Sequence, residues 1–137
     1  MTEGLGEYVI IAHVGIIVSD IERSKKFYLA ALRPIGYQML LEYGVTATRP
    51  AASAGFGAPP RADLWLYQGT PGHVTTHIAF QVDRRRLVDE FYAAALAAGG
   101  RDNGKPGLRP QYSANYYGAF VLDPDGYNIE ALCREVE

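Results

Sequence analysis

Two stretches of the chain decide its fold: HVGIIVSDIERSKKFYLAALRPIG at residues 13–36 and HIAFQVDRRRLVDEFYAAALAAGG at residues 77–100. Aligned without a gap, they share eight identities in 24 positions, and each begins with a histidine, His13 or His77. An internal repeat of this kind constrains the architecture more than any single motif does. The sequence therefore predicts two related modules in tandem.

Each copy of the repeat opens with an apolar stretch that predicts a strand. Residues 8–18 are almost all apolar and often β-branched, as in a strand that is covered on both faces. Alternation along the strand places His13 beside Gly15 on one face, and it places His77 beside Ala79 on the equivalent face. A small neighbour leaves room beside each imidazole, so this face is predicted to line a cavity.

A helix is predicted after each of these strands. Ser19 followed by Glu22 has the spacing of a capping box at the first helix, and Asp83 is a candidate cap for the second. Proline and glycine at residues 34–36 predict the end of the first helix, and the glycine pair at 99–100 predicts the end of the second.

The remainder of each module predicts further strands. Residues 49–61 and 103–115 are rich in glycine and proline and are interpreted as equivalent loops. The predicted fold is α+β, with two βαβββ modules (about 8–69 and 73–134) in a single domain, 1–137, whose curved mixed sheets surround a central cavity. The later strands are predicted at residues 37–43, 64–68, 117–122 and 127–133.

Composition excludes several classes of partner. A chain of 137 residues that is 48% hydrophobic can form one well-packed core. The net charge of −2 gives no reason to expect nucleic acid or an anionic membrane as a partner. One cysteine, Cys133, fits a reducing compartment, and the N-terminal sequence lacks the features of a signal peptide. A cytoplasmic protein is expected.

The predicted last strand supplies a third candidate ligand beside the two histidines. Glu130 lies among apolar residues, where a carboxylate is costly unless it is paired or bound to a cation. Two imidazoles and a carboxylate bind first-row divalent metals and leave coordination positions open. Either histidine alone would be interpreted as structural, but their equivalence in the repeat, together with Glu130, favours a metal site.

A fourth protein ligand is not expected. The repeat interval places Leu66 at the position equivalent to Glu130, and the only carboxylate nearby is Asp63, at the start of that strand. Water or substrate would fill the remaining positions, as in catalytic metal sites.

Candidate substrate contacts come from residues 105–117 and from the first module. Arg109 is placed to bind an anionic group, and a tyrosine hydroxyl is a candidate proton donor or orienting group. Packing without a role in binding is the alternative for all of these residues, and no catalytic acid or base is identified. The candidate substrate-binding residues are Arg109, Tyr112, Ser113, Tyr116 and Trp65.

Three segments together resemble the vicinal oxygen chelate superfamily, also called glyoxalase/bleomycin resistance/dioxygenase-like: HVGIIVSDIERSKKFY, THIAFQV and FVLDPDGYNIEAL. The resemblance implies paired βαβββ modules whose strands curve around a metal held at His13, His77 and Glu130. It also implies a lyase, isomerase, thiol transferase or ring-cleaving dioxygenase that holds two adjacent substrate oxygens on the metal. Glyoxalase I usually has a glutamate at the position assigned to Leu66, so this chain departs from glyoxalase I itself.

The function expected is that of a metal-dependent enzyme acting on a small molecule, with Fe, Mn, Zn, Ni or Co as the cofactor. The resemblance also implies a homodimer, and the site lies either within one chain or across two. The alternative is a non-catalytic binding protein that sequesters an antibiotic or another small molecule.

Overall fold

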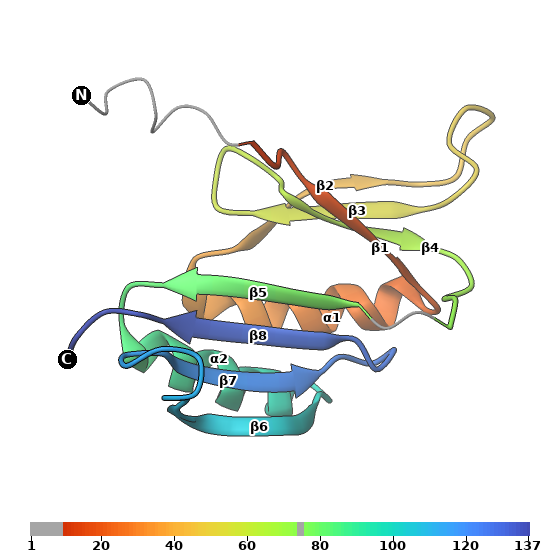
Figure 1. Ribbon diagram of the computed structural model, residues 1–137. Coiled ribbons are helices and arrows are strands. Elements are labelled where there is room, and N and C mark those ends of the chain that lie inside the picture. The colour runs from red at the N-terminus through yellow and green to blue at the C-terminus, as the bar shows by residue number, and fades with distance from the viewer. Residues whose placement is uncertain (1–9, 74–75) are drawn as a thin grey trace.

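The computed structural model describes residues 10–73 and 76–137 (Figure 1), which form two sheets and two α-helices. The first module contains β1 (Val14–Val18), α1 (Ile21–Leu32), the short 3-10 helix η2 (Arg33–Ile35), β2 (Gln38–Tyr43), β3 (Ser53–Gly57) and β4 (Leu64–Gln68). The second contains β5 (His77–Val82), α2 (Arg85–Ala97), β6 (Arg101–Leu108), β7 (Tyr117–Leu122) and β8 (Asn128–Cys133).

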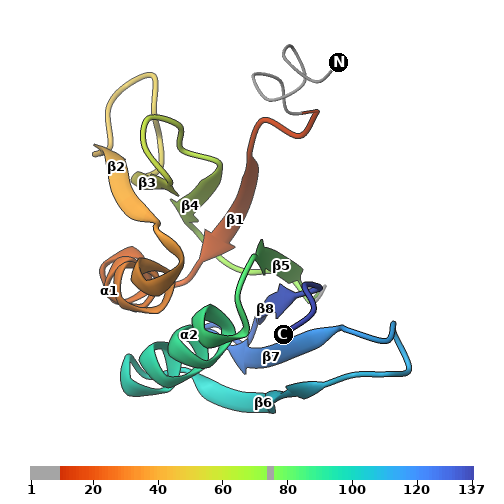
Figure 2. The same ribbon diagram turned by 90° about the vertical axis from the view of Figure 1, so that its left-hand side faces the viewer.

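The two sheets have the same topology, with strand orders β1-β4-β3-β2 and β5-β8-β7-β6. In each sheet the first strand is parallel to the last strand of its module, and the other neighbours are antiparallel. The predicted α+β fold of two tandem βαβββ modules is confirmed. The sheets stay separate, however, and do not enclose the central cavity that was predicted, because α1 and α2 pack against each other and the sheets extend apart from them (Figure 2).

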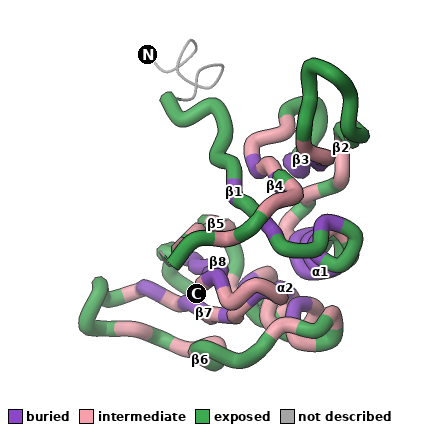
Figure 3. Tube along the Cα trace, turned by 90° about the vertical axis from the view of Figure 1, so that its right-hand side faces the viewer, coloured by how far each residue is buried: buried purple, intermediate pink, exposed green. Residues whose placement is uncertain are grey.

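The core lies where the helices cover the sheets. Figure 3 shows the buried residues gathered there, whereas residues 10–15 and 44–50 are exposed. Phe27 and Phe91, which match in the repeat, are both buried, and so is Tyr28. Burying such aromatic side chains contributes much of the hydrophobic free energy of a small domain.

The helix ends were only partly predicted. Asp20 rather than Ser19 caps α1, because its carboxylate accepts a hydrogen bond of 3.1 Å from the backbone N–H of Arg23. The predicted Asp83 cap is wrong, since α2 begins at Arg85 and the cap position falls on Arg84, which makes no side-chain capping bond. Gly36, with φ of 92°, ends the first helical segment as expected.

Two strands lie in segments that were predicted to be loops. Strand β3 has the sequence SAGFG and β6 has RDNGKPGL, and small, charged or glycine-rich sequences of this kind have low strand propensity. Both strands form because neighbouring strands pair with them, with bulge-like register shifts along β2–β3 and β6–β7. Strand β1 is shorter than predicted; residues 8 and 9 of that prediction lie outside the described residues.

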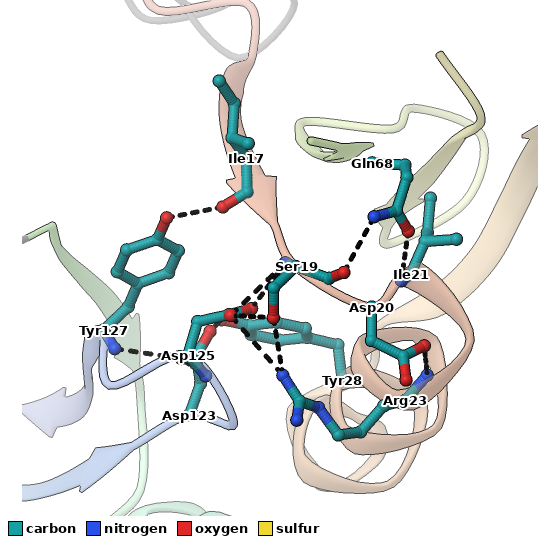
Figure 4. Close-up of polar contacts among 10 residues, drawn as sticks. All are labelled: Ile17, Ser19, Asp20, Ile21, Arg23, Tyr28, Gln68, Asp123, Asp125 and Tyr127. Carbon is teal, nitrogen blue, oxygen red and sulfur yellow. Dashed lines mark hydrogen bonds and ion pairs between the residues drawn. The ribbon is translucent and has the colours of Figure 1, made fainter. Parts of the chain in front are cut away.

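A network of hydrogen bonds joins the modules at the turn between β7 and β8 (Figure 4). The Tyr127 hydroxyl donates a bond of 2.5 Å to the carbonyl oxygen of Ile17 in β1. The Asp125 carboxylate accepts bonds from the backbone N–H and the hydroxyl of Ser19. This contact explains why Ser19 is not the helix cap.

Buried Asp123 anchors the same turn. It accepts hydrogen bonds from the Tyr28 hydroxyl and from the backbone N–H groups of Asp125 (2.8 Å) and Tyr127 (2.9 Å). Burial raises the pKa of Asp123 above its ordinary value, although these three bonds act in the opposite direction. The turn therefore holds a desolvated carboxylate against the first module.

Candidate functional site

His77 and Glu130 are held together by two parallel strands. Glu130 in β8 lies opposite Ala79 in β5, two residues beyond His77. His77 Nε2 lies 2.8 Å from Glu130 Oε1, and the side chains are 51% and 3% exposed respectively. A half-exposed imidazole and a buried carboxylate are thus within hydrogen-bond distance, side by side on one face of the sheet.

Tyr116 completes the surroundings of Glu130. Its hydroxyl donates a hydrogen bond to Glu130 Oε2, the oxygen that does not face His77. Burial, and then the bond to Glu130, raise the pKa of Tyr116 to about 12, so the phenol stays protonated at neutral pH. Gly118 leaves room for this arrangement, because a Cβ there would lie 3.2 Å from the Tyr116 ring and 3.4 Å from Glu130 Oε2.

His13 lies on the other sheet, immediately before β1. It lines a cavity of about 670 Å³ together with Trp65 and Tyr67 of β4, and neither His77 nor Glu130 borders that cavity. In the part of one chain that the structure describes, no three His, Cys, Asp or Glu side chains are placed to hold a metal ion. The structure therefore joins two of the three predicted ligands and leaves His13 apart.

The strand registers show which residue of the first module corresponds to Glu130. Gly15 and Ala79 match in the repeat; Gly15 pairs with Trp65 and Ala79 pairs with Glu130. The equivalent residue is therefore Trp65 and not Leu66. The interval between His13 and His77 predicted the wrong residue, because equivalent residues in the last strands of the two modules lie one residue further apart in the sequence. Leu66 is fully buried and faces the core.

Comparison with known proteins establishes the family. The sequence profile described as Glyoxalase/Bleomycin resistance protein/Dioxygenase superfamily matches residues 10–131. The chain belongs to this superfamily. Among curated protein sequences, none matches the chain.

Solved structures of the superfamily share the fold. A glyoxalase/bleomycin resistance protein from Albidiferax ferrireducens T118 superposes with a TM-score of 0.73 at 29% identity, covering 92% of this chain and 100% of that one. A mutant of glyoxalase I from Zea mays gives 0.69 at 25% identity, covering 90% of this chain and 46% of that protein. A mutant of the fosfomycin resistance protein FosX from Listeria monocytogenes gives 0.65 at 20% identity and coverage of 91% and 92%.

The other candidate substrate contacts occupy different places. The Arg109 guanidinium donates hydrogen bonds to the carbonyl oxygens of Lys105 and Gly107 and thus stabilises its own turn. Tyr112, which is 60% exposed, packs edge-on against the Tyr116 ring with centroids 5.0 Å apart. Ser113 is exposed, and its backbone bonds to Arg109 and Tyr116 within the same turn. Only Tyr116 in this loop contacts a predicted metal ligand, while Trp65 borders the cavity of the first module.

Several residues at that cavity were missed. Tyr43 stacks on Trp65, and the Arg49 guanidinium lies 3.8 Å from the centre of the Tyr43 ring. Tyr43 belonged to a predicted strand, but its strand neighbour β3 was interpreted as a loop, so nothing connected it to Trp65. The sequence held no signal for Tyr43 and Arg49, because only the pairing of β2, β3 and β4 brings them to Trp65.

Proposed function

We propose that this member of the superfamily is a metal-dependent enzyme whose site is completed by a second copy of the chain. His77 and Glu130 of one copy and His13 of the other would hold one divalent cation, such as Fe, Mn, Zn, Ni or Co. The observation that carries the proposal is the approach of His77 Nε2 to the buried Glu130 carboxylate at 2.8 Å. Burying a carboxylate costs free energy, and a bound cation compensates this cost.

The need for a second copy follows from the open arrangement of the two sheets. His13 immediately precedes β1, an edge strand of its sheet, and the side chain of Ile17 in β1 is 47% exposed. His77 lies on β5, which is also an edge strand. In a two-fold dimer, the first module of each copy would face the second module of the other and form two identical sites.

The proposed donor set is compatible with Lewis-acid chemistry. When bound, the metal would act as a Lewis acid toward a small substrate that presents two adjacent oxygens, in lyase, isomerase or ring-cleaving dioxygenase chemistry. Tyr116 would hold one Glu130 oxygen and so fix the direction of the other. Trp65, at the position equivalent to Glu130, supplies no further ligand and leaves coordination positions open for the substrate.

Related structures support this assignment. The FosX structure, which shares the fold, was determined with Mn(II) and 1S,2S-dihydroxypropylphosphonic acid. The single free thiol, Cys133, is buried, which is compatible with action in the reducing cytoplasm.

The test is metal stoichiometry in single and mixed variants. H13A, H77A and E130A should each lose stoichiometric binding of Mn(II) or Zn(II), whereas H73A, at an exposed histidine, should retain it. When H13A and E130A are refolded together, each mixed dimer contains one site with all three ligands, so about half of the sites in that dimer should return. Tight binding by H77A and E130A, or no recovery on mixing, would reject the proposal.

A non-catalytic binding protein is the second candidate, favoured by the aromatic cavity beside His13. The cavity is bordered by the Arg49 cation and by no carboxylate among the described residues, which disfavours sequestration of a cationic drug. Purified protein that contains no metal, and that binds no added metal but binds small molecules tightly, would support this second function.

A further inference from the structure

The cavity of the first module has a wall of three nearly parallel aromatic rings, Tyr43, Trp65 and Tyr67, here called the aromatic shelf. The Tyr43 and Trp65 rings are inclined by 6° with centroids 6.0 Å apart, and Trp65 and Tyr67 by 21° with centroids 6.4 Å apart. All three border the same cavity of about 670 Å³. That volume is in the range of small-molecule sites.

Two glycines allow the rings to lie close to the sheet. A Cβ at Gly55 would lie 2.8 Å from Trp65 Cζ2, and a Cβ at Gly15 would lie 2.6 Å from Tyr67 Cε2. Any larger residue would push these rings outward. The space over Gly15 is therefore filled by the Tyr67 ring, and the cavity beside His13 is lined by ring faces.

The charge beside the shelf is positive. The Arg49 guanidinium lies 3.8 Å from the centre of the Tyr43 ring, and it forms no ion pair with any residue that the structure describes. The imidazole of His13 also borders the cavity, and no carboxylate does so among the described residues. A guanidinium placed in this way favours a carboxylate or a similar planar anion.

We propose that the aromatic shelf binds a planar aromatic acid, with the ring against Trp65 and Tyr67 and the acid group toward Arg49. Parallel rings favour stacking with a flat ligand over packing with a puckered one. That such an acid is the enzyme's substrate rests on the proposed function. That the shelf binds it can be tested without any metal.

The experiment uses benzoate as the probe, with the full chain in a buffer that contains a chelator. Trp65 is the only tryptophan, so intrinsic tryptophan fluorescence reports directly on the shelf. Benzoate should change this fluorescence with saturation, and cyclohexanecarboxylate should bind about five-fold more weakly because its ring is not planar. Benzyl alcohol, which lacks the charge, should also bind more weakly. Equal affinity for all three compounds, or no saturable binding of benzoate, would overturn the proposal.

Variants assign the binding to the shelf. R49Q changes an exposed side chain and should weaken benzoate binding about ten-fold. G55A should weaken it by displacing the Trp65 ring, whereas G44A is the matched control, because a Cβ at Gly44 meets nothing within 4 Å. Unchanged affinity in both R49Q and G55A would overturn the proposal.

Two measurements on the unmodified protein separate this inference from the metal site. Benzoate should bind in the buffer with the chelator, and Mn(II) or Zn(II) should bind in a buffer without it. Loss of benzoate binding when the metal is removed would overturn the assignment to the shelf alone. Retained benzoate binding in a protein that never binds metal would reject the proposed function and leave the shelf intact.

Discussion

Trp65 and Glu130 occupy equivalent positions in the two modules, since each lies opposite the small residue that follows its module's histidine by two positions. One module therefore carries a carboxylate where the other carries an indole. In the proposed dimer these side chains would face each other across the metal, so the indole would border the site without binding the ion.

The first prediction exploits this equivalence. Trp65→Glu should add a fourth ligand and raise the affinity for Mn(II) or Zn(II) by at least roughly ten-fold. Removing a residue that only orients a metal ligand already changes metal affinity by about that factor. Competition with a chelating dye measures the change. Trp65→Leu is the control, because it removes the indole without adding a ligand. Equal metal affinities in the two variants would place Trp65 outside the metal site.

A second prediction concerns the bond between Tyr116 and Glu130. Tyr116→Phe removes the hydroxyl that holds Oε2 of the buried carboxylate, so metal affinity should fall about ten-fold while the stoichiometry is unchanged. The same dye competition gives the affinity, and circular dichroism checks the fold. Tyr112→Phe, at a ring that is 60% exposed in the same loop, should leave affinity unchanged. A similar loss in both variants would point to the loop rather than to this hydrogen bond.

A third prediction follows from the raised pKa of Asp123. Because burial raises this pKa above the ordinary value of 3.8, the native state holds the proton more tightly than the unfolded chain does. The contribution of Asp123 to stability is therefore full below pH 3.8 and falls as pH rises through the raised pKa. Asp123→Asn has no such titration, and its amide oxygen can still accept the bonds from Asp125 and Tyr127.

The measurement is urea unfolding of both proteins from acidic to neutral pH. The free energy of unfolding of the unmodified protein minus that of Asp123→Asn should decrease as pH rises. Asp83→Asn, at an exposed carboxylate, is the control. A difference that is constant or increases with pH would show that the hydrogen bonds, and not burial, dominate at Asp123.

The repeat predicted much of the fold, because its apolar periodicity survives in both modules. Strands β4 and β7 match the predicted ranges, since their apolar and aromatic residues have high strand propensity. Strands β3 and β6 could not be recognised, because pairing with neighbouring strands determines them and their own composition does not. The local sequence pattern thus determines some strands, and pairing with neighbouring strands determines the others.

The candidate site was predictable only where it depends on adjacent strands of one sheet. Parallel pairing within a module brings His77 and Glu130 together, and the strand alternation of the sequence contains that information. The separation of His13 depends on how the modules pack through α1 and α2, which no local pattern describes. The equivalence of Trp65 and Glu130 depends on strand register, where an offset of one residue changes the answer.

The last prediction concerns one of the hydrogen bonds that join the two modules. The Tyr127 hydroxyl donates a bond of 2.5 Å to the Ile17 carbonyl, and the Tyr127 side chain is largely buried. Tyr127→Phe should lower the free energy of unfolding by about 1 kcal/mol, because the Ile17 carbonyl loses its donor at a partly buried contact. Urea denaturation measures the change, with Tyr112→Phe as the control. If the modules pack independently of this bond, the two variants will unfold at the same urea concentration.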